Sequence, residues 1–153
     1  MTINRQKLLL IKEQQFEYNQ KITSTVGLVN FMTNVLKINN EAQEVTYLLS
    51  LNNKNQLVSF TEIARGGLDM CNLSQNQIFK TVLLSNSNKF ILVHNHPTGD
   101  PTPSKSDIET TKRILNSCKI LGIEFLDHLV IGDSEYQSIM KYLEIWERTN
   151  KND

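Results

Sequence analysis

The segment "KFILVHNHPTGDPTPSKSD" (residues 89–107) combines three structural signals in a short stretch of chain. It opens with the continuous apolar run 89–93, which is typical of a strand buried on both faces. The loop that follows contains all three prolines of the chain and two of its three histidines. Ser104 and Asp107 then have the spacing of a capping box, with Asp in place of the usual Glu. The segment therefore predicts a buried strand, a stiff loop and a capped helix, in that order.

The two histidines have the spacing of neighbouring metal ligands on an extended chain. His94 and His96 are two residues apart, and side chains at that spacing leave the same face of a strand. Pro97 favours an extended conformation for His96, and the short return into the helix brings Asp107 towards the strand end. Two histidine nitrogens and one carboxylate oxygen suit Zn²⁺, with a fourth position open to water. The same residues also fit a proline-stiffened loop and a capped helix without metal, so spacing alone leaves both interpretations open.

Upstream of this segment the sequence predicts one helix, a β-hairpin and a second helix. Apolar residues recur at helical spacing over 25–37, which indicates an amphipathic helix. The stretches 44–51 and 56–64 are rich in β-formers and are separated by an asparagine-rich turn, as in a hairpin. Ser74 is placed to cap the second helix. The hairpin implies that the sheet of this protein is mixed rather than purely parallel.

Downstream, the helix after the proline loop is predicted to end at Gly122, because glycine favours the left-handed position that closes a helix. The run "IEFLDHLVIG" (123–132) indicates another strand. A last helix is outlined by Tyr136, Ile139, Leu143 and Trp146. Strands that alternate with helices predict an α/β fold, with a mixed central β-sheet and helices packed on it.

Length and composition indicate one soluble globular domain. The chain has 153 residues, 39% apolar and 21% charged, which is enough for a substantial core. We expect an N-terminal extension over 1–22, whose "KLLLI" run fits either a strand or a short helix, and a domain over 23–153. That apolar run is too short for a signal peptide or a membrane span, so we expect a cytoplasmic protein without membrane association. Cys71 and Cys118 have apolar neighbours and are expected to be buried free thiols.

The charge balance gives little support to nucleic-acid binding. Sixteen basic and sixteen acidic residues cancel, and the formal net charge is zero. Proteins that depend on phosphate contacts usually show a basic excess or stripe. Any association with DNA would therefore have to rest on features other than overall charge.

The segment "HNHPTGDPTPSKSD" (94–107) resembles the JAMM signature of the JAB/MPN metalloprotease superfamily, which is His-x-His-Pro, six residues, then Ser-x-x-Asp. It is most similar to the RadC-type branch, in which HNHPSG precedes PS-x-x-D. The resemblance continues through "LGIEFLDHLVIG" (121–132) and the hairpin "EVTYLLSLNNKNQLV" (44–58), and it covers about residues 22–140. It implies a single-domain JAB/MPN fold, similar to that of cytidine deaminases.

The resemblance also implies roles for five residues. His94, His96 and Asp107 would bind one Zn²⁺ per chain, with a water as the fourth ligand. Glu44 would be the general base, and Ser104 would hydrogen-bond the oxyanion of a tetrahedral intermediate. From the residues alone, Glu44 could equally be a solvated charge at a strand start, and Ser104 could act only as an N-cap. The implied activity is hydrolysis of a peptide or isopeptide bond, with a peptide or protein as substrate.

Three residues of this sequence depart from the usual RadC pattern, and the resemblance also allows a second function. Thr98 replaces a serine after His-Pro, and Gln75 and Asn76 lie where the family commonly has an arginine, so substrate orientation can differ. The alternative implied function is a DNA-repair-associated accessory or binding protein that keeps the zinc site without turnover. The family name and context are the only support for the DNA association, and the missing arginine is the only hint of lost turnover.

Other polar and aromatic residues near the signature have simpler expected roles. His128 stands on a different strand, and we expect it to hydrogen-bond near the site rather than to bind the metal. Asp100 and Asp127 are expected to be turn or hydrogen-bonding groups. Tyr142 and Trp146 are expected to pack within the last helix, although an exposed aromatic patch there could serve a partner.

Overall fold

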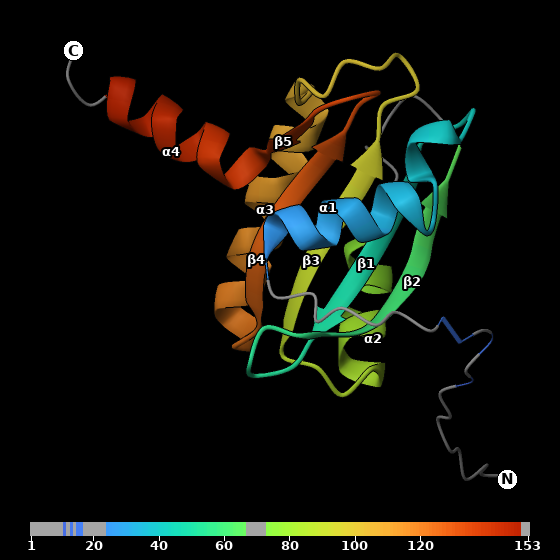
Figure 1. Ribbon diagram of the computed structural model, residues 1–153. Helices are drawn as coiled ribbons and strands as arrows, with labels where there is room; N and C mark the ends of the chain where they lie inside the picture. The colour runs from blue at the N-terminus through green and yellow to red at the C-terminus, as the bar shows by residue number, and fades with distance from the viewer. Residues whose placement is uncertain (1–10, 12, 14, 17–23, 67–72, 151–153) are drawn as a thin grey trace, which may run out of the picture.

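A computed structural model shows an α/β domain built on one mixed sheet (Figure 1). The residues it describes are 11, 13, 15, 16, 24–66 and 73–150. Within these residues, four α-helices pack on a five-stranded sheet whose spatial order is β2-β1-β3-β4-β5. The predicted α/β class and mixed sheet are confirmed, and the arrangement is consistent with a JAB/MPN fold.

The sheet combines antiparallel pairs with one parallel pair. Its strands are β1 (Val45–Leu51), β2 (Leu57–Arg65), β3 (Lys89–Asn95), β4 (Glu124–Ile131) and β5 (Tyr136–Ser138). Strand β1 pairs antiparallel with β2 and β3, β3 pairs in parallel with β4, and β4 pairs antiparallel with β5. The predicted hairpin is therefore β1–β2. Asn52 closes its turn, because its side-chain oxygen accepts hydrogen bonds from the N–H groups of Lys54 (2.9 Å) and Gln56 (3.0 Å).

Helices cover both faces of the sheet. They are α1 (Thr25–Asn34), α2 (Gln75–Leu84), α3 (Lys105–Leu121) and α4 (Ile139–Asn150), with a 3₁₀ turn η1 (Ile38–Asn40) before β1. Helix α1 crosses one face, whereas α2 and α3 lie on the other (Figure 1). Because successive side chains of a strand point to opposite faces, Leu48 packs in the core under α2 and α3 and Leu49 packs in the core under α1.

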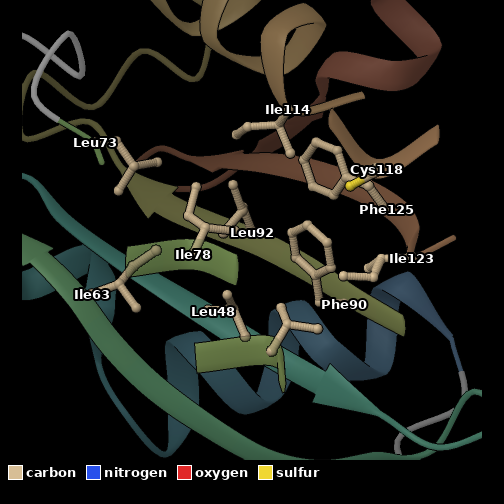
Figure 2. Close-up of a cluster of buried hydrophobic side chains, with 11 residues drawn as sticks. Leu48, Ile63, Leu73, Ile78, Phe90, Leu92, Ile114, Cys118, Ile123 and Phe125 are labelled. Atoms are coloured by element: carbon tan, nitrogen blue, oxygen red, sulfur yellow. The ribbon is translucent and has the colours of Figure 1, made fainter. Parts of the chain in front are cut away.

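Strand β3 lies at the centre of the sheet and is buried on both faces, which explains the apolar run 89–93. Phe90 and Leu92 belong to the core under α2 and α3 (Figure 2), where the ring of Phe90 stacks on that of Phe125 with centroids 4.7 Å apart. Cys118 is buried in the same cluster as a free thiol, as predicted, and burial raises the pKa of this thiol to about 11. Cys71 lies outside the described residues. The rigid core on both sides of β3 fixes the strand end from which the histidines project.

Two details upstream of the signature differ from the predictions. Helix α1 ends at Asn34 rather than at residue 37, because Val35 is its C-cap and Lys37, directly before η1, adopts a left-handed conformation with φ 53°. Ser74 precedes α2 as predicted, but its side chain makes no capping hydrogen bond. Its backbone carbonyl instead accepts a hydrogen bond from the N–H of Ile78 (3.1 Å) and so begins the helix.

The predicted last helix begins later than expected. Tyr136 lies in β5 and pairs with Ile131 of β4, so its inclusion in the helix was wrong. The helix begins after Ser138, whose hydroxyl oxygen accepts a hydrogen bond from the N–H of Lys141 (3.2 Å). Tyr142 is 37% exposed and therefore only partly packed, and the side chain of Trp146 lies outside the described part of the structure. Helical spacing across a short strand and the following helix produced the error.

The N-terminal extension predicted over 1–22 lies almost wholly outside the described residues, and its structure stays a prediction. Phe16 is one described residue of it, and its ring contacts that of Phe60 on β2 with centroids 5.4 Å apart. No helix in the described ranges has both the length and the apolar character needed to span a bilayer.

Candidate metal centre

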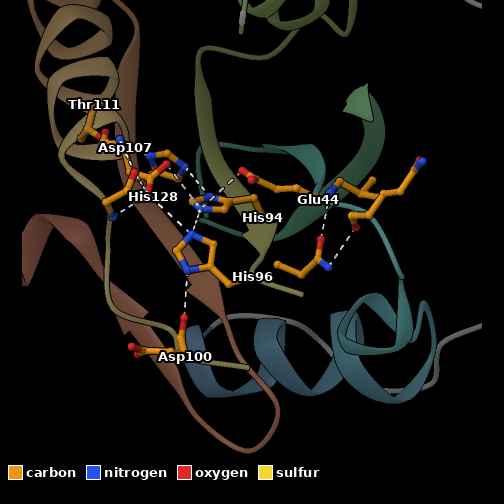
Figure 3. Close-up of polar contacts among 11 residues, drawn as sticks. Glu44, His94, His96, Asp100, Asp107, Thr111 and His128 are labelled. Carbon is orange, nitrogen blue, oxygen red and sulfur yellow. Dashed lines mark hydrogen bonds and ion pairs between the residues drawn. The ribbon is translucent and has the colours of Figure 1, made fainter. Parts of the chain in front are cut away.

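The three residues predicted to bind metal lie together where β3 ends (Figure 3). His94 is within β3 and stands opposite Thr46 of β1 and Val130 of β4, so neighbouring strands hold its backbone on both sides. His96 follows the strand, and Asp107 lies in the first turn of α3. The strand, loop and helix formed by residues 89–107 therefore bring the three side chains to one place.

The loop between His96 and α3 is folded tightly against the turn after β4. Gly99 has a φ of 82°, which favours glycine, and its carbonyl accepts a hydrogen bond from the N–H of Asp133 (3.1 Å). Gly132 makes this approach possible, because a Cβ at that position would overlap the Gly99 carbonyl. Contact with the β4–β5 turn thus fixes the path from His96 to the helix.

Ser104 and Asp107 form the predicted capping box at the start of α3. The oxygen Oδ2 of Asp107 accepts hydrogen bonds from both the N–H and the hydroxyl of Ser104, each 2.7 Å long. Asp107 is only 1% exposed, and its other oxygen, Oδ1, is buried without a hydrogen-bond partner among the described residues. Buried carboxylate oxygens are normally hydrogen-bonded. The capping box therefore orients a carboxylate whose remaining oxygen is left for another kind of contact.

The candidate ligand atoms converge on one point. The Nε2 atoms of His94 and His96 are 3.2 Å apart, and Asp107 Oδ1 lies 3.5 Å from His94 Nε2. Zinc bonds of about 2.0–2.1 Å place tetrahedral ligand atoms about 3.3–3.4 Å apart. These two separations are close to this edge length, all three ligand atoms lie within 4.8 Å of one another, and two imidazoles with one carboxylate are a typical zinc donor set. The cluster could therefore hold a metal ion.

The far side of each imidazole is hydrogen-bonded. His96 Nδ1 lies 2.8 Å from the backbone carbonyl of Asp100, which can only accept, so Nδ1 carries a hydrogen and Nε2 of the neutral ring keeps a lone pair. His94 Nδ1 lies 3.0 Å from Nε2 of His128, and His128 Nδ1 lies 2.7 Å from the hydroxyl of Thr111. His128 thus hydrogen-bonds behind a candidate ligand, as expected from its place on another strand.

Charge and burial also suit a cation. Burial lowers the pKa of His94 well below its ordinary value and lowers the pKa of His128 to about 4, so both imidazoles are neutral at neutral pH. The carboxylate of Asp107 raises the pKa of His96. Burial alone would raise the pKa of Asp107, but its contacts with His96, His94 and Ser104 outweigh burial and lower it. The cluster therefore presents an ionised carboxylate beside a neutral, buried His94.

Glu44 lies directly before β1 and turns its carboxylate towards the cluster (Figure 3). Its Oε1 atom is 4.0 Å from His94 Nε2, and the side chain is 9% exposed. Glu41, the other acid near the start of the hairpin, instead pairs with Arg65 at 2.7 Å. Of these two acids, Glu44 is the one that the fold brings to the candidate metal position.

Asn95, between the two histidines, ties the segment before β1 to the end of β3. Its Oδ1 accepts a hydrogen bond from the N–H of Val45 (2.8 Å), and its Nδ2 donates to the carbonyls of Glu41 (3.3 Å) and Gln43 (3.1 Å). Asn95 is 1% exposed. The residue between two candidate ligands therefore also fixes the backbone that carries Glu44.

The remaining acids that the sequence singled out have structural contacts. Asp100 accepts a hydrogen bond from the N–H of Thr102 (2.9 Å) and closes its own turn. Asp127 accepts a hydrogen bond from the hydroxyl of Ser138 (2.8 Å) and joins β4 to the start of α4. Burial raises the pKa of Asp127. These contacts agree with the expected turn and hydrogen-bonding roles.

Gln75 stands in the neighbourhood where the RadC pattern commonly has an arginine. Its side-chain oxygen accepts a hydrogen bond from the hydroxyl of Ser117 (3.2 Å), which joins the start of α2 to α3. In this structure, Gln75 therefore makes a hydrogen bond between two helices.

Sequence reasoning missed Asn95, Thr111 and Gly132. Asn95 carried a weak signal, because an amide that interrupts a buried strand end usually has a backbone partner. Thr111 and Gly132 carried no usable signal, since His128 lies on another strand from Thr111 and Gly99 lies in another loop from Gly132.

Comparison with known proteins places the chain among bacterial relatives. The family model of the RadC-like JAB domain matches residues 22–144. The "UPF0758 protein SH1266" of Staphylococcus haemolyticus is 39% identical over 128 residues, which cover 84% of this chain and 55% of that protein. A UPF0758 protein of Clostridium perfringens is 43% identical over 97 residues, covering 63% of this chain and 43% of that protein. The chain thus spans about half the length of the curated relatives it matches.

Proposed function

Because the chain belongs to the RadC-like JAB domain family, we propose that it is a zinc-dependent hydrolase that cleaves an amide bond in a peptide or protein. The observation that carries the proposal is the convergence of two imidazole nitrogens and a buried carboxylate oxygen, with the Glu44 carboxylate 4.0 Å from His94 Nε2. Three protein ligands are typical of catalytic zinc, because they leave one coordination position open.

In this proposal each residue of the site has one task. His94, His96 and Asp107 would hold Zn²⁺, which when bound would supply a Lewis acid for the scissile carbonyl and would lower the pKa of the attacking water. Glu44 Oε1 accepts a proton from the attacking water and delivers it to the leaving amine. The hydrogen bonds of Asn95 keep the backbone before β1 in place while this proton moves.

Ser104 combines capping with a proposed contact to substrate. The residue is exposed, and its hydroxyl donates to Asp107 Oδ2 at 2.7 Å in this structure. A carboxylate that shares its charge with a cation is a weaker acceptor, so the hydroxyl can turn towards a developing oxyanion. Its oxygen can still accept from the N–H of Asp107, and capping and oxyanion stabilisation are therefore compatible.

The proposal is tested with a panel of peptides and isopeptide-linked substrates, and cleavage is followed by mass spectrometry. We expect products from the zinc-loaded protein and none after chelation or with Glu44→Gln, which should still bind zinc. Glu41→Gln is the matched control, because its acid pairs with Arg65, and it should cleave like the wild type. Equal turnover by Glu44→Gln, or cleavage that survives chelation, would contradict the proposed roles.

A zinc-loaded wild type that cleaves nothing in the panel would instead match the accessory or binding-protein alternative. The formal net charge of zero gives DNA binding no comparable support.

A further inference from the structure

Behind the candidate metal position, a chain of hydrogen bonds leads away from His94 and returns to Asp107. His94 Nδ1 is 3.0 Å from His128 Nε2, and His128 Nδ1 is 2.7 Å from the Thr111 hydroxyl. The same hydroxyl donates to the backbone carbonyl of Asp107 at 2.7 Å. His94, Thr111 and His128 are each 0% exposed, so water does not complete these bonds. These hydrogen bonds connect β3, which carries His94, through His128 of β4 to α3, which carries Asp107.

The bond from Thr111 to the Asp107 carbonyl determines which atom donates in each of the other hydrogen bonds. A carbonyl can only accept, so the bond from Thr111 to the Asp107 carbonyl uses the one hydrogen of the hydroxyl. The hydroxyl oxygen must then accept from His128 Nδ1–H. A neutral imidazole has one donor and one acceptor, so His128 Nε2 accepts from His94 Nδ1–H. His94 Nε2 is left with a lone pair, and it is the atom that lies 3.2 Å from His96 Nε2.

The opposite direction would leave His94 unable to bind a cation. If Thr111 donated to His128 Nδ1, His128 Nε2 would carry the hydrogen and His94 Nδ1 would have to accept it. His94 Nε2 would then carry a hydrogen that points at the candidate metal position. The direction of the Thr111 hydroxyl therefore sets which nitrogen of the neutral His94 ring has a lone pair free for a cation.

We propose that Thr111 and His128 are positioning residues that hold His94 as its Nδ1–H tautomer and tie its ring to the helix that carries Asp107. The proposal rests on the metal role proposed above for His94, and it assigns neither residue a contact with substrate. Hydrogen-bond partners behind a histidine ligand fix its tautomer and ring orientation and raise its basicity.

The test is a long-range ¹H–¹⁵N NMR spectrum of the metal-free full chain labelled on histidine. The chain contains only three histidines, so spectra of His96→Gln and His128→Gln assign the ring nitrogens. We expect His94 and His128 each to carry hydrogen on Nδ1 and a bare Nε2. A spectrum in which His94 carries its hydrogen on Nε2 would overturn the proposal, whether or not the protein hydrolyses anything.

Variants then connect the tautomer to metal affinity, measured by competition with a chromogenic zinc chelator. Thr111→Val removes only the hydroxyl and should mix the His94 tautomers and weaken zinc binding by about 10–100-fold. Thr111→Ser, which keeps a hydroxyl, should have the wild-type His94 tautomer and the wild-type zinc affinity. Thr110→Val is the matched control, because Thr110 is a neighbour of equal burial whose hydroxyl instead accepts from Arg113, and it should change neither. Wild-type tautomers and affinity in Thr111→Val would overturn the proposal.

A second pair of variants tests His128 directly. His128→Gln offers an amide oxygen that can accept the hydrogen on His94 Nδ1, whereas His128→Leu offers no acceptor. We expect His128→Gln to bind zinc at least several-fold more tightly than His128→Leu. Equal affinity of the two variants would contradict the proposed bond. A wild type that binds no zinc would refute the metal role of the site, while the NMR spectrum would still decide the tautomer.

Discussion

Substitution of Asn95 should destabilise the domain strongly, because its side chain hydrogen-bonds three backbone groups at and before the start of β1. Asn95→Ala would leave the N–H of Val45 buried without its present acceptor and would remove the donors to Glu41 and Gln43. A buried N–H without a partner costs about 1–3 kcal/mol, and each ordinary hydrogen bond contributes about 0.5–1.5 kcal/mol. The two carbonyls are only part-buried and can be solvated, so we expect a total loss of about 2–4 kcal/mol.

For a domain of this length, each kcal/mol corresponds to about 2–4 °C in Tm, so Asn95→Ala should melt about 4–16 °C lower. The assays are denaturant unfolding followed by circular dichroism and hydrogen exchange of the Val45 amide, which should exchange faster in the variant. Asn88→Ala, at an exposed turn asparagine, should stay within about 0.5 kcal/mol of wild type.

The side-chain hydrogen bonds described for Asn95 all go to backbone groups before β1 and none to a candidate ligand atom, so zinc affinity should fall far less than turnover when Glu44 is no longer held in place. Unchanged stability and an equally protected Val45 amide in Asn95→Ala would refute this account of how Glu44 is placed.

Three further predictions follow from the site. Gly132→Ala should lower zinc affinity at least tenfold in a chelator competition, because the new Cβ would displace the Gly99 carbonyl; an unchanged affinity would show that the loop can adjust. Ser104→Ala should destabilise the fold by about 1 kcal/mol, as loss of an N-cap does, and should reduce turnover more than it reduces zinc affinity. Zinc at 100 times its Kd should add about 2.7 kcal/mol to the free energy of unfolding, which a thermal melt with and without chelator would detect. An identical Tm in both samples would contradict a folded-state metal site.

The sequence predicted the parts of the structure that depend on local pattern. The apolar run of β3, the capping box of Ser104 and Asp107, and the glycine at the end of α3 each have a chemical signal confined to a few neighbouring residues. The candidate ligand set could be predicted for the same reason, because one loop and its two flanking elements supply it.

The parts that could not be predicted depend on how separate elements are registered in space. Thr111 is one of two adjacent threonines on α3, and only its position opposite His128 of β4 gives it a role near the metal position. Tyr136 was misplaced because three residues of β5 are too few to break a helical pattern that continues into α4. Glu44 rather than Glu41 lies beside the cluster, and it is the pairing of β1 with β3 that brings Glu44 there.

The zinc content of the purified chain, measured after exposure to zinc and extensive dialysis, tests the proposed metal site most directly. We expect one zinc per chain in the wild type and none in a folded His94→Ala/His96→Ala double variant. Absence of zinc from the wild type, or equal zinc in both proteins, would contradict the proposed metal site.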